Sequence, residues 1–223
     1  MNTNFVISKG VYYIMKYSNW KTVLKKYIKN NNKEYLLVCI LFLIGLFTGV
    51  MIINNSNENK IVEIVKYIND LKDMYKKVEI INQFQLTMQS IKKNLLFASI
   101  LWIGGTTVIG LPIVLMSILI RGIILGFTLA SITITFGTIK GIMFCMASLV
   151  LHNIIYIPAI LTIGVSSIKL YKSIVKDKRK DNIKIEILRH IIISTIMMVL
   201  LVLSAIIENY VTLKTLKKII KYF

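Results

Sequence analysis

The chain has 223 residues, of which 56% are hydrophobic and 17% charged, with 28 basic against 10 acidic side chains. Soluble domains are less apolar and more charged, and disordered chains need low hydrophobicity, so both classes are excluded. The basic residues behind the net charge of +18 lie in segments between apolar runs. Cytoplasmic loops and contact with anionic lipid explain basic residues at such places, so nucleic-acid binding is not needed to explain them. We therefore expect an all-α polytopic membrane protein in a lipid bilayer.

Residues 1–35 form a basic segment in front of the first apolar run. Apolar residues share one helical face there, namely Trp20, Val23, Leu24, Tyr27 and Ile28. This pattern predicts an amphipathic helix on the cytoplasmic leaflet. Residues 36–53 carry no charge and are long enough to cross a bilayer core about 30 Å thick, so we expect a transmembrane anchor there.

Residues 54–93 are predicted to form an external loop with a second amphipathic helix. Apolar residues recur in this loop at alternating spacings of three and four, and charged residues occupy the other face. The apolar seam consists of Ile61, Ile64, Ile68, Leu71, Tyr75 and Val78. Such a seam packs on the protein's own spans, lies on lipid, or docks an extracellular partner, and the periodicity does not distinguish these alternatives.

Residues 94–207 are predicted to form a transmembrane bundle, whose first part holds two spans. Arg121 is the only charged residue between positions 95 and 136, a run too long for one span and suited to two. We expect the break at Gly110-Leu111-Pro112, because proline disfavours helical geometry in the preceding residue and suits a helix start.

The next apolar run, residues 139–170, is too long for one straight span and short for two. His152, Asn153 and Pro158 interrupt its middle. These residues indicate freed backbone groups, and the charge distribution decides between the two alternatives in favour of one kinked span at 141–168.

The charge distribution sets the number of crossings. The N-terminal segment and residues 172–189 are both strongly basic, so both are expected in the cytoplasm, with an even number of crossings between them. A final span is expected at 190–207. The sequence therefore predicts about five transmembrane helices, the fourth kinked, and a basic C-terminal tail at 208–223 outside the cell.

Glycine spacing predicts close helix packing. Three pairs are four residues apart, which lets two helix backbones approach each other: Gly45/Gly49, Gly122/Gly126 and Gly137/Gly141. The spacing fits an internal contact as well as a homo-oligomer.

Few residues in the spans are suited to catalysis. No Asp or Glu lies between Glu79 and Asp177, and His152 and His190 are far apart without a metal-binding motif. Paired-aspartate proteolysis is therefore excluded. A Ser-His or Ser-Lys arrangement stays open, although no serine is marked as activated. We expect no enzyme activity, no catalytic residue, no cofactor and no metal.

The remaining polar residues of the spans are candidates for structural roles. Arg121 requires a carbonyl or polar partner, an ion pair with a partner or lipid, or a path to the interface. His152 either stabilises the kink or acts as a ligand. The full set of structural and packing candidates is Gly45, Gly49, Gly110, Pro112, Arg121, Gly122, Gly126, His152, Asn153 and Pro158.

Three motifs occur in a fixed order: residues 104–112 (GGTTVIGLP), residues 121–128 (RGIILGFT) and residues 152–159 (HNIIYIPA). With them the chain resembles the stage II sporulation protein M family, most strongly from residue 103 to 169. Many members of the wider family have His-Gly-x-x-Glu-x-Pro-Ala, whereas this chain has Asn153 for the glycine and Tyr156 for the glutamate. The sporulation branch also lacks that acid.

The resemblance implies a multi-span scaffold without enzymatic activity in the mother-cell membrane of an endospore-forming bacterium. It also implies recruitment of stage II sporulation proteins D and P, the peptidoglycan-degrading pair of engulfment. A transport-type component, such as a permease subunit, is the alternative, because broken helices often line substrate sites. Since wall hydrolases act outside the membrane, the seam of the 54–93 loop is the candidate for partner contact.

Overall fold

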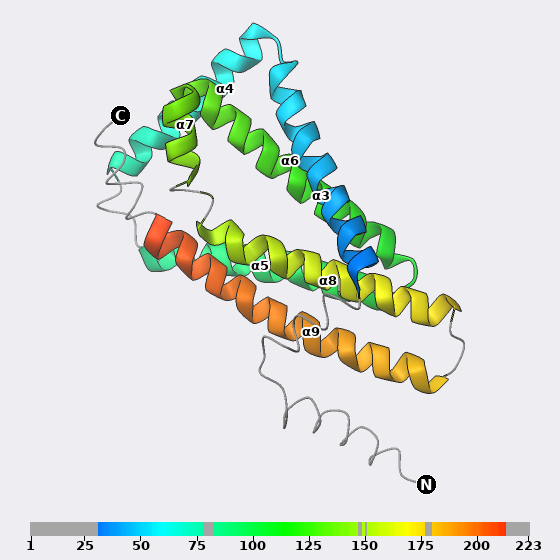
Figure 1. The fold of residues 1–223 in the computed structure, drawn as a ribbon. Coiled ribbons are helices and arrows are strands. Elements are labelled where there is room, and N and C mark those ends of the chain that lie inside the picture. The colour runs from blue at the N-terminus through cyan, green and yellow to red at the C-terminus, as the bar shows by residue number, and fades with distance from the viewer. Residues whose placement is uncertain (1–30, 78–82, 147–148, 150, 177–179, 213–223) are drawn as a thin grey trace.

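The computed structural model describes residues 31–77, 83–146, 149, 151–176 and 180–212, and these residues are built of helices (Figure 1). The helices are α3 (Asn32–Asn54), α4 (Glu58–Lys77), α5 (Gln83–Thr106), α6 (Gly110–Phe136), α7 (Thr138–Cys145), α8 (Leu151–Lys176), α9 (Lys180–Ile207) and the π-helical turn η2 (Glu208–Thr212). The amphipathic helix predicted at 20–28 and the tail beyond residue 212 lie outside the described ranges.

Within the described ranges, four helices are long and apolar enough to cross a membrane: α3, α6, α8 and α9. α5 is not among them, because its first half carries polar residues that include Lys92 and Lys93. Its apolar second half, residues 95–106, would reach only about 18 Å against a core of about 30 Å. The predicted number of about five spans is therefore not confirmed.

The predicted fourth span, 141–168, is divided between two helices. α7 ends at Cys145, and α8 begins at Leu151 and continues to Lys176. The prediction misplaced this span because α7 folds back along α6, so the chain reaches the next membrane helix later than expected. Pro158 lies inside α8, and the kink predicted there is not confirmed.

The basic stretch at 172–189, predicted as a loop, lies largely in helices. α8 ends at Lys176, and α9 starts at Lys180, ten residues before the predicted start of the last span. The run from Lys184 to Arg189 consists of good or moderate helix formers, so the last span continues into its basic flank.

The helices form two groups (Figure 1). α3 and α6 lie side by side as a pair, which is inclined to a second group of α5, α8 and α9. α8 is central: 61% of its crossing segment is buried, against 28–33% for the other three spans. Apolar side chains of α8, such as Ile160 and Ile163, share one core with Val38 of α3, Leu101 of α5 and Ile118 of α6.

The helix termini gather at two opposite ends of the molecule. At the first end, Lys172 of α8 donates to a carboxylate oxygen of Glu34 at the start of α3, at 2.5 Å. At the second end, Ser204 of α9 donates to the main-chain oxygen of His152 at the start of α8, at 3.0 Å. α3, α6 and α9 thus run from the first end to the second, and α5 and α8 run back. α4 and α7 are connections at the second end.

This arrangement predicts the relative sides of three exposed positions. In a chain with Cys39→Ser and Cys145→Ala, cysteines introduced by Asn55→Cys and Thr138→Cys should react with an impermeant thiol reagent from one side of the membrane. A cysteine introduced by Ile109→Cys, in the α5–α6 turn, should react only from the opposite side. Labelling of all three from the same side in intact cells would contradict the helix directions described above.

Candidate functional site

The glycines of α3 and α6 meet where these two helices cross. A β-carbon added to Gly45 would lie 2.3 Å from the main-chain oxygen of Leu119, and one added to Gly122 would lie 2.4 Å from that of Phe42. A helix backbone cannot yield at such distances without bending or moving as a whole. The contact therefore requires glycine at both positions, because only a residue without a side chain lets the two backbones come into van der Waals contact.

The same crossing is reciprocal under a shift of 77 residues, from position 45 to 122 and from 49 to 126. The shift takes Leu46, whose oxygen would lie 2.0 Å from a β-carbon on Gly126, to Ile123, whose oxygen would lie 2.1 Å from one on Gly49. Because α3 and α6 run in the same direction, the crossing has a local pseudo-twofold axis along the bundle.

Gly137 and Gly141, the third pair, have separate roles. Gly137 follows the last residue of α6 with a φ of +80°, a backbone conformation that glycine adopts without strain. A β-carbon on Gly141 would lie 2.7 Å from Cα of Thr133, so α7 folds back directly onto the last turns of α6. Phe136 and Phe144 pack against each other beside this turn, with ring centroids 5.2 Å apart.

The break predicted around Gly110 is a three-residue turn at 107–109, and Pro112 lies in the first turn of α6. The Gly110 N–H donates to Oγ1 of Thr107 at 3.0 Å. A β-carbon on Gly110 would lie 2.1 Å from the main-chain oxygen of Gly104. The turn is therefore tight enough to place α6 directly beside the end of α5.

Arg121 faces an aromatic ring of α8. Its guanidinium carbon lies 4.3 Å from the ring centroid of Tyr156, which is 2% exposed and stacks on Phe97 of α5 at 6.5 Å. The electron-rich face of an aromatic ring attracts a cation without a buried carboxylate. The ring of Tyr156 thus gives Arg121 a neutral partner inside the bundle.

His152 and Asn153 are buried near the second end of the molecule. The Asn153 amide donates to the main-chain oxygen of Leu149 at 2.8 Å, and the His152 main-chain oxygen accepts from Ser204 of α9. Both residues thus take part in hydrogen bonds to main-chain oxygens at the start of α8, where no water is present in hydrocarbon to pair with these oxygens.

Pro158 belongs to a chain of hydrogen bonds between α3 and α8. The Thr162 hydroxyl donates to the main-chain oxygen of Pro158 at 2.8 Å. Since that hydrogen is used, the Tyr35 hydroxyl donates to Oγ1 of Thr162 at 3.1 Å. The start of α3 is thereby attached to the middle of α8, one turn after the proline.

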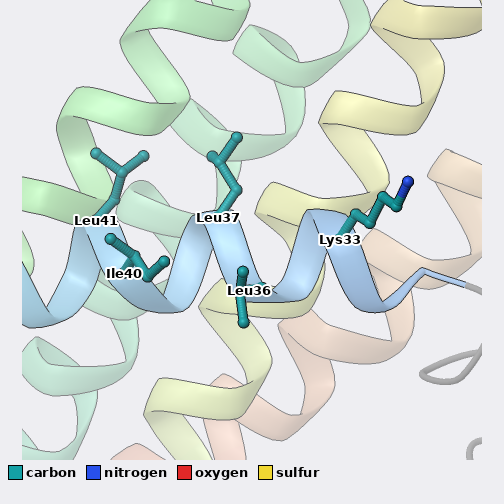
Figure 2. A pocket seen from close by; sticks show the side chains of 5 residues that line it. All are labelled: Lys33, Leu36, Leu37, Ile40 and Leu41. Carbon is teal, nitrogen blue, oxygen red and sulfur yellow. The ribbon is translucent and has the colours of Figure 1, made fainter.

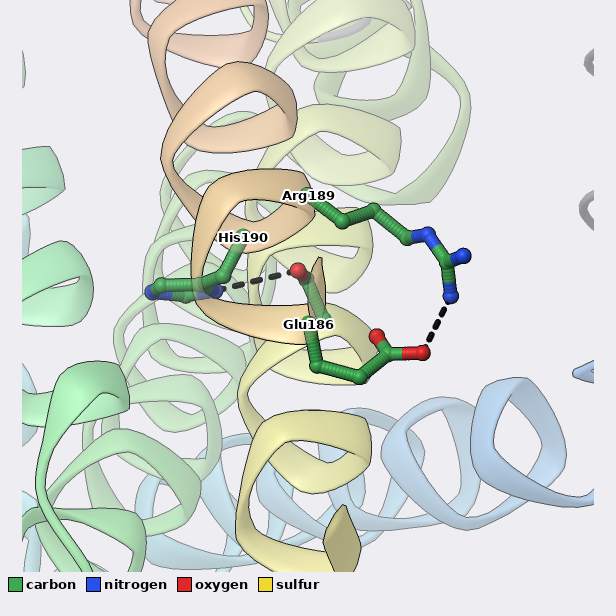
Figure 3. A network of polar contacts seen from close by, with 4 residues as sticks. Glu186, Arg189 and His190 are labelled. Atoms are coloured by element: carbon green, nitrogen blue, oxygen red, sulfur yellow. Dashed lines mark hydrogen bonds and ion pairs between the residues drawn. The ribbon is translucent and has the colours of Figure 1, made fainter. Parts of the chain in front are cut away.

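A buried Ser–His pair, which the sequence left open, joins three helices at the first end. His190 of α9 is 1% exposed, and its Nδ1 lies 3.0 Å from Oγ of Ser166 (Figure 3). Its Nε2 lies 3.3 Å from the main-chain oxygen of Trp102. A carbonyl only accepts, so Nε2 carries the hydrogen and the Ser166 hydroxyl donates to Nδ1. Both ring nitrogens are thus used, which favours a structural role.

Gly105 makes room for this pair. A β-carbon there would lie 2.2 Å from Oγ of Ser167 and 2.8 Å from the His190 ring. Glu186 and Arg189, on the same part of α9, form an ion pair on the side facing away from His190 (Figure 3). Two adjacent serines in an apolar helix and a histidine at the edge of the next span were the available sequence signals for the pair.

The predicted seam of α4 is half-buried in the structure. Its members Ile61, Ile64, Ile68 and Leu71 are all partly covered, and α4 contacts α6. The Tyr75 side chain and Val78 lie outside the described part of the chain. On other faces of α4, Val62 and Tyr67 are 67% and 63% exposed.

Metal binding has no geometric support in the described ranges: no three His, Cys, Asp or Glu side chains gather there as a metal site requires. Together, the groups described above join helices through backbone contact, a cation–π contact and hydrogen bonds.

A model of the stage II sporulation protein M family matches residues 38–213. No curated protein and no solved structure matches the chain.

Replacement of a crossing glycine should separate α3 from α6. We expect Gly126→Ala and Gly122→Ala to lower the free energy of unfolding by about 1–3 kcal/mol, because an added methyl group overpacks a backbone contact. The conservative change Ile124→Leu, on the half-exposed face of α6, is the matched control and should stay within about 0.5 kcal/mol. Unfolding in detergent followed by circular dichroism measures both. Equal stability of the glycine variants and the control would show that the helices do not cross here.

The ring of Tyr156, and not its hydroxyl, should hold Arg121. Tyr156→Phe keeps the aromatic face and should retain most of the stability, whereas Tyr156→Leu should lose about 1–2 kcal/mol more. A double-mutant cycle with Arg121→Met separates the cation–π contact from lost packing. A coupling energy of zero in that cycle would rule the contact out.

Proposed function

The chain belongs to the stage II sporulation protein M family, and on that premise we propose that it is a non-enzymatic membrane scaffold for engulfment in endospore formation. It recruits and localises the peptidoglycan-degrading stage II sporulation proteins D and P in the mother-cell membrane. The observation that carries this proposal is the family match over residues 38–213, which takes in nearly the whole described bundle.

The internal pairing of polar side chains supports a role without catalysis. His190 uses both ring nitrogens on protein groups, and Arg121 is held over an aromatic ring. An activated nucleophile needs a base and room for a substrate. Ser166, the serine next to a histidine nitrogen, is 4% exposed and lies between three helices, so a substrate has no room beside it.

The scaffold proposal requires an external surface, and α4 offers one. By the positive-inside rule, the first end of the molecule, with Lys169, Lys172 and Arg189, is the cytoplasmic end. α4 and α7 then lie outside, where peptidoglycan is. Because the seam of α4 is partly covered and α4 contacts α6, we place the partner contact at the more exposed residues Val62 and Tyr67, which lie on two different faces of this helix.

A transport-type component, such as a permease subunit, is the second candidate. Its support is the half-buried cation of Arg121 inside a membrane helix, opposite a helix that contains Pro158. Charged residues inside spans and interrupted helices often mark solute paths. The cation–π contact and the Thr162 bond to the proline carbonyl weigh against this candidate, because both groups already have protein partners.

Co-purification from sporulating cells tests the proposal. The tagged chain should recover proteins D and P, and Val62→Asp with Tyr67→Asp should reduce this recovery roughly tenfold, because a carboxylate would be buried without a partner. Ile139→Asp is the matched control: Ile139 is 78% exposed on α7 at the same end and should keep normal recovery.

The membrane abundance of each variant must equal that of the natural chain. Normal recovery with the double variant would move the contact away from Val62 and Tyr67. Recovery of an ATPase or a solute-binding subunit in place of D and P would replace the scaffold by the transport candidate.

A further inference from the structure

The first turns of α3 carry an apolar groove on the outside of the bundle (Figure 2). The groove is shallow and open, and its described lining comes from one helix: Lys33, Leu36, Leu37, Ile40 and Leu41. Leu36, Leu37 and Ile40 are 64%, 45% and 46% exposed. Since these residues belong to a membrane-crossing helix, hydrocarbon and not water must cover them.

Lys33 stands at one end of this groove (Figure 2). Its side chain is exposed, and no hydrogen bond or ion pair joins it to another described residue. The adjacent acid, Glu34, is bonded to Lys172 and points its charge toward α8. The ammonium group of Lys33 is therefore available to an anion from outside the chain.

The spacing along the helix matches one leaflet of a bilayer. From Lys33 to Leu41 the helix advances about 12 Å, and half of a bilayer core is about 15 Å. A cation at the headgroup level is thus followed by aliphatic side chains over most of the depth of an acyl chain. One phospholipid molecule supplies a partner for each in the same order, namely a headgroup phosphate for the cation and an acyl chain for the aliphatic side chains.

The surrounding charge favours an anionic headgroup. Basic residues outnumber acidic ones in the described parts of the helices at this end: Lys33, Lys169, Lys172, Lys176, Lys180, Lys184 and Arg189 against Glu34, Asp181 and Glu186. Each basic residue near an anionic membrane surface adds attraction, which falls off within a Debye length. A zwitterionic headgroup would gain little from this excess.

We infer that this groove is a binding site for one anionic phospholipid of the leaflet at the first end of the molecule. The Lys33 ammonium donates to the headgroup phosphate, and one acyl chain lies over Leu36, Leu37 and Ile40. A helix of another protein would have to bring an acid and an apolar stripe at matching depths, whereas an anionic phospholipid carries both in one molecule.

Native mass spectrometry of the full chain in a neutral detergent tests this inference. The probes are dioleoyl phosphatidylglycerol and dioleoyl phosphatidylcholine, which share their acyl chains and differ in net charge. The natural chain should bind the glycerol lipid more tightly. Lys33→Gln should weaken that binding about fivefold, the equivalent of ~1 kcal/mol for one basic residue, and leave the choline lipid unchanged. Lys33→Arg should keep the preference.

Lys60→Gln is the matched control, because Lys60 is an exposed lysine on α4 at the opposite end and should not affect either lipid. Should Lys33→Gln change the thermal stability without lipid, the natural chain in about 0.5 M ammonium acetate replaces this variant, and its preference for the glycerol lipid should be lost by screening. Equal affinity of the natural chain for the two lipids, or an unchanged preference in Lys33→Gln, would overturn the site.

Discussion

The contact on which the rest of this structure depends is the crossing of two helix backbones at glycine. Helix association inside a membrane gains little from the hydrophobic effect, because lipid tails are as apolar as the side chains, so close packing carries the pairing. The carbonyl oxygens of α3 face Gly122 and Gly126, and those of α6 face Gly45 and Gly49. This contact fixes α3 against α6, and through α3 it places Tyr35 on α8.

The polar groups of the spans follow one rule, which is that main-chain carbonyls receive most of their hydrogen bonds. Hydroxyls along the helices donate to carbonyls one turn earlier, as in Thr48 to Ile44 and Ser117 to Ile113. Bonds between helices use the same acceptor, from Asn94 of α5 to Leu201 of α9 at 3.1 Å. Hydrogen bonds of this kind hold the helices together in hydrocarbon, and the side chains that make them have little capacity left for chemical reaction.

The features that sequence reasoning predicts well are local. The length of the apolar runs locates α3 and the region of α6, and glycine spacing identifies positions of close contact. The ordered motifs identify the family, which the match over 38–213 confirms. Each of these signals is carried within one helix or in the order of short segments.

The features that it misses depend on which helices become neighbours. α5 packs beside α8 and α9, although only its second half is as apolar as the span predicted there. The pair of Ser166 and His190 is 24 residues apart and forms only because α8 and α9 are antiparallel. At the predicted fourth span, His152, Asn153 and Pro158 predict a kink, whereas the chain turns earlier, at Gly137, whose positive φ ends α6 and starts the fold-back of α7.

The reciprocity of the α3–α6 crossing has a consequence for charge. Two surfaces that contact each other through the same set of positions form an isologous interface, the type found between identical subunits. Here both halves lie in one polypeptide, so the two sides are free to differ. The shift of 77 residues takes Ile44, which is 51% exposed, to Arg121, whose cation rests on Tyr156. A symmetric dimer would carry that cation twice or not at all, whereas this chain places a single positive charge on one side of its own pseudo-symmetric pair.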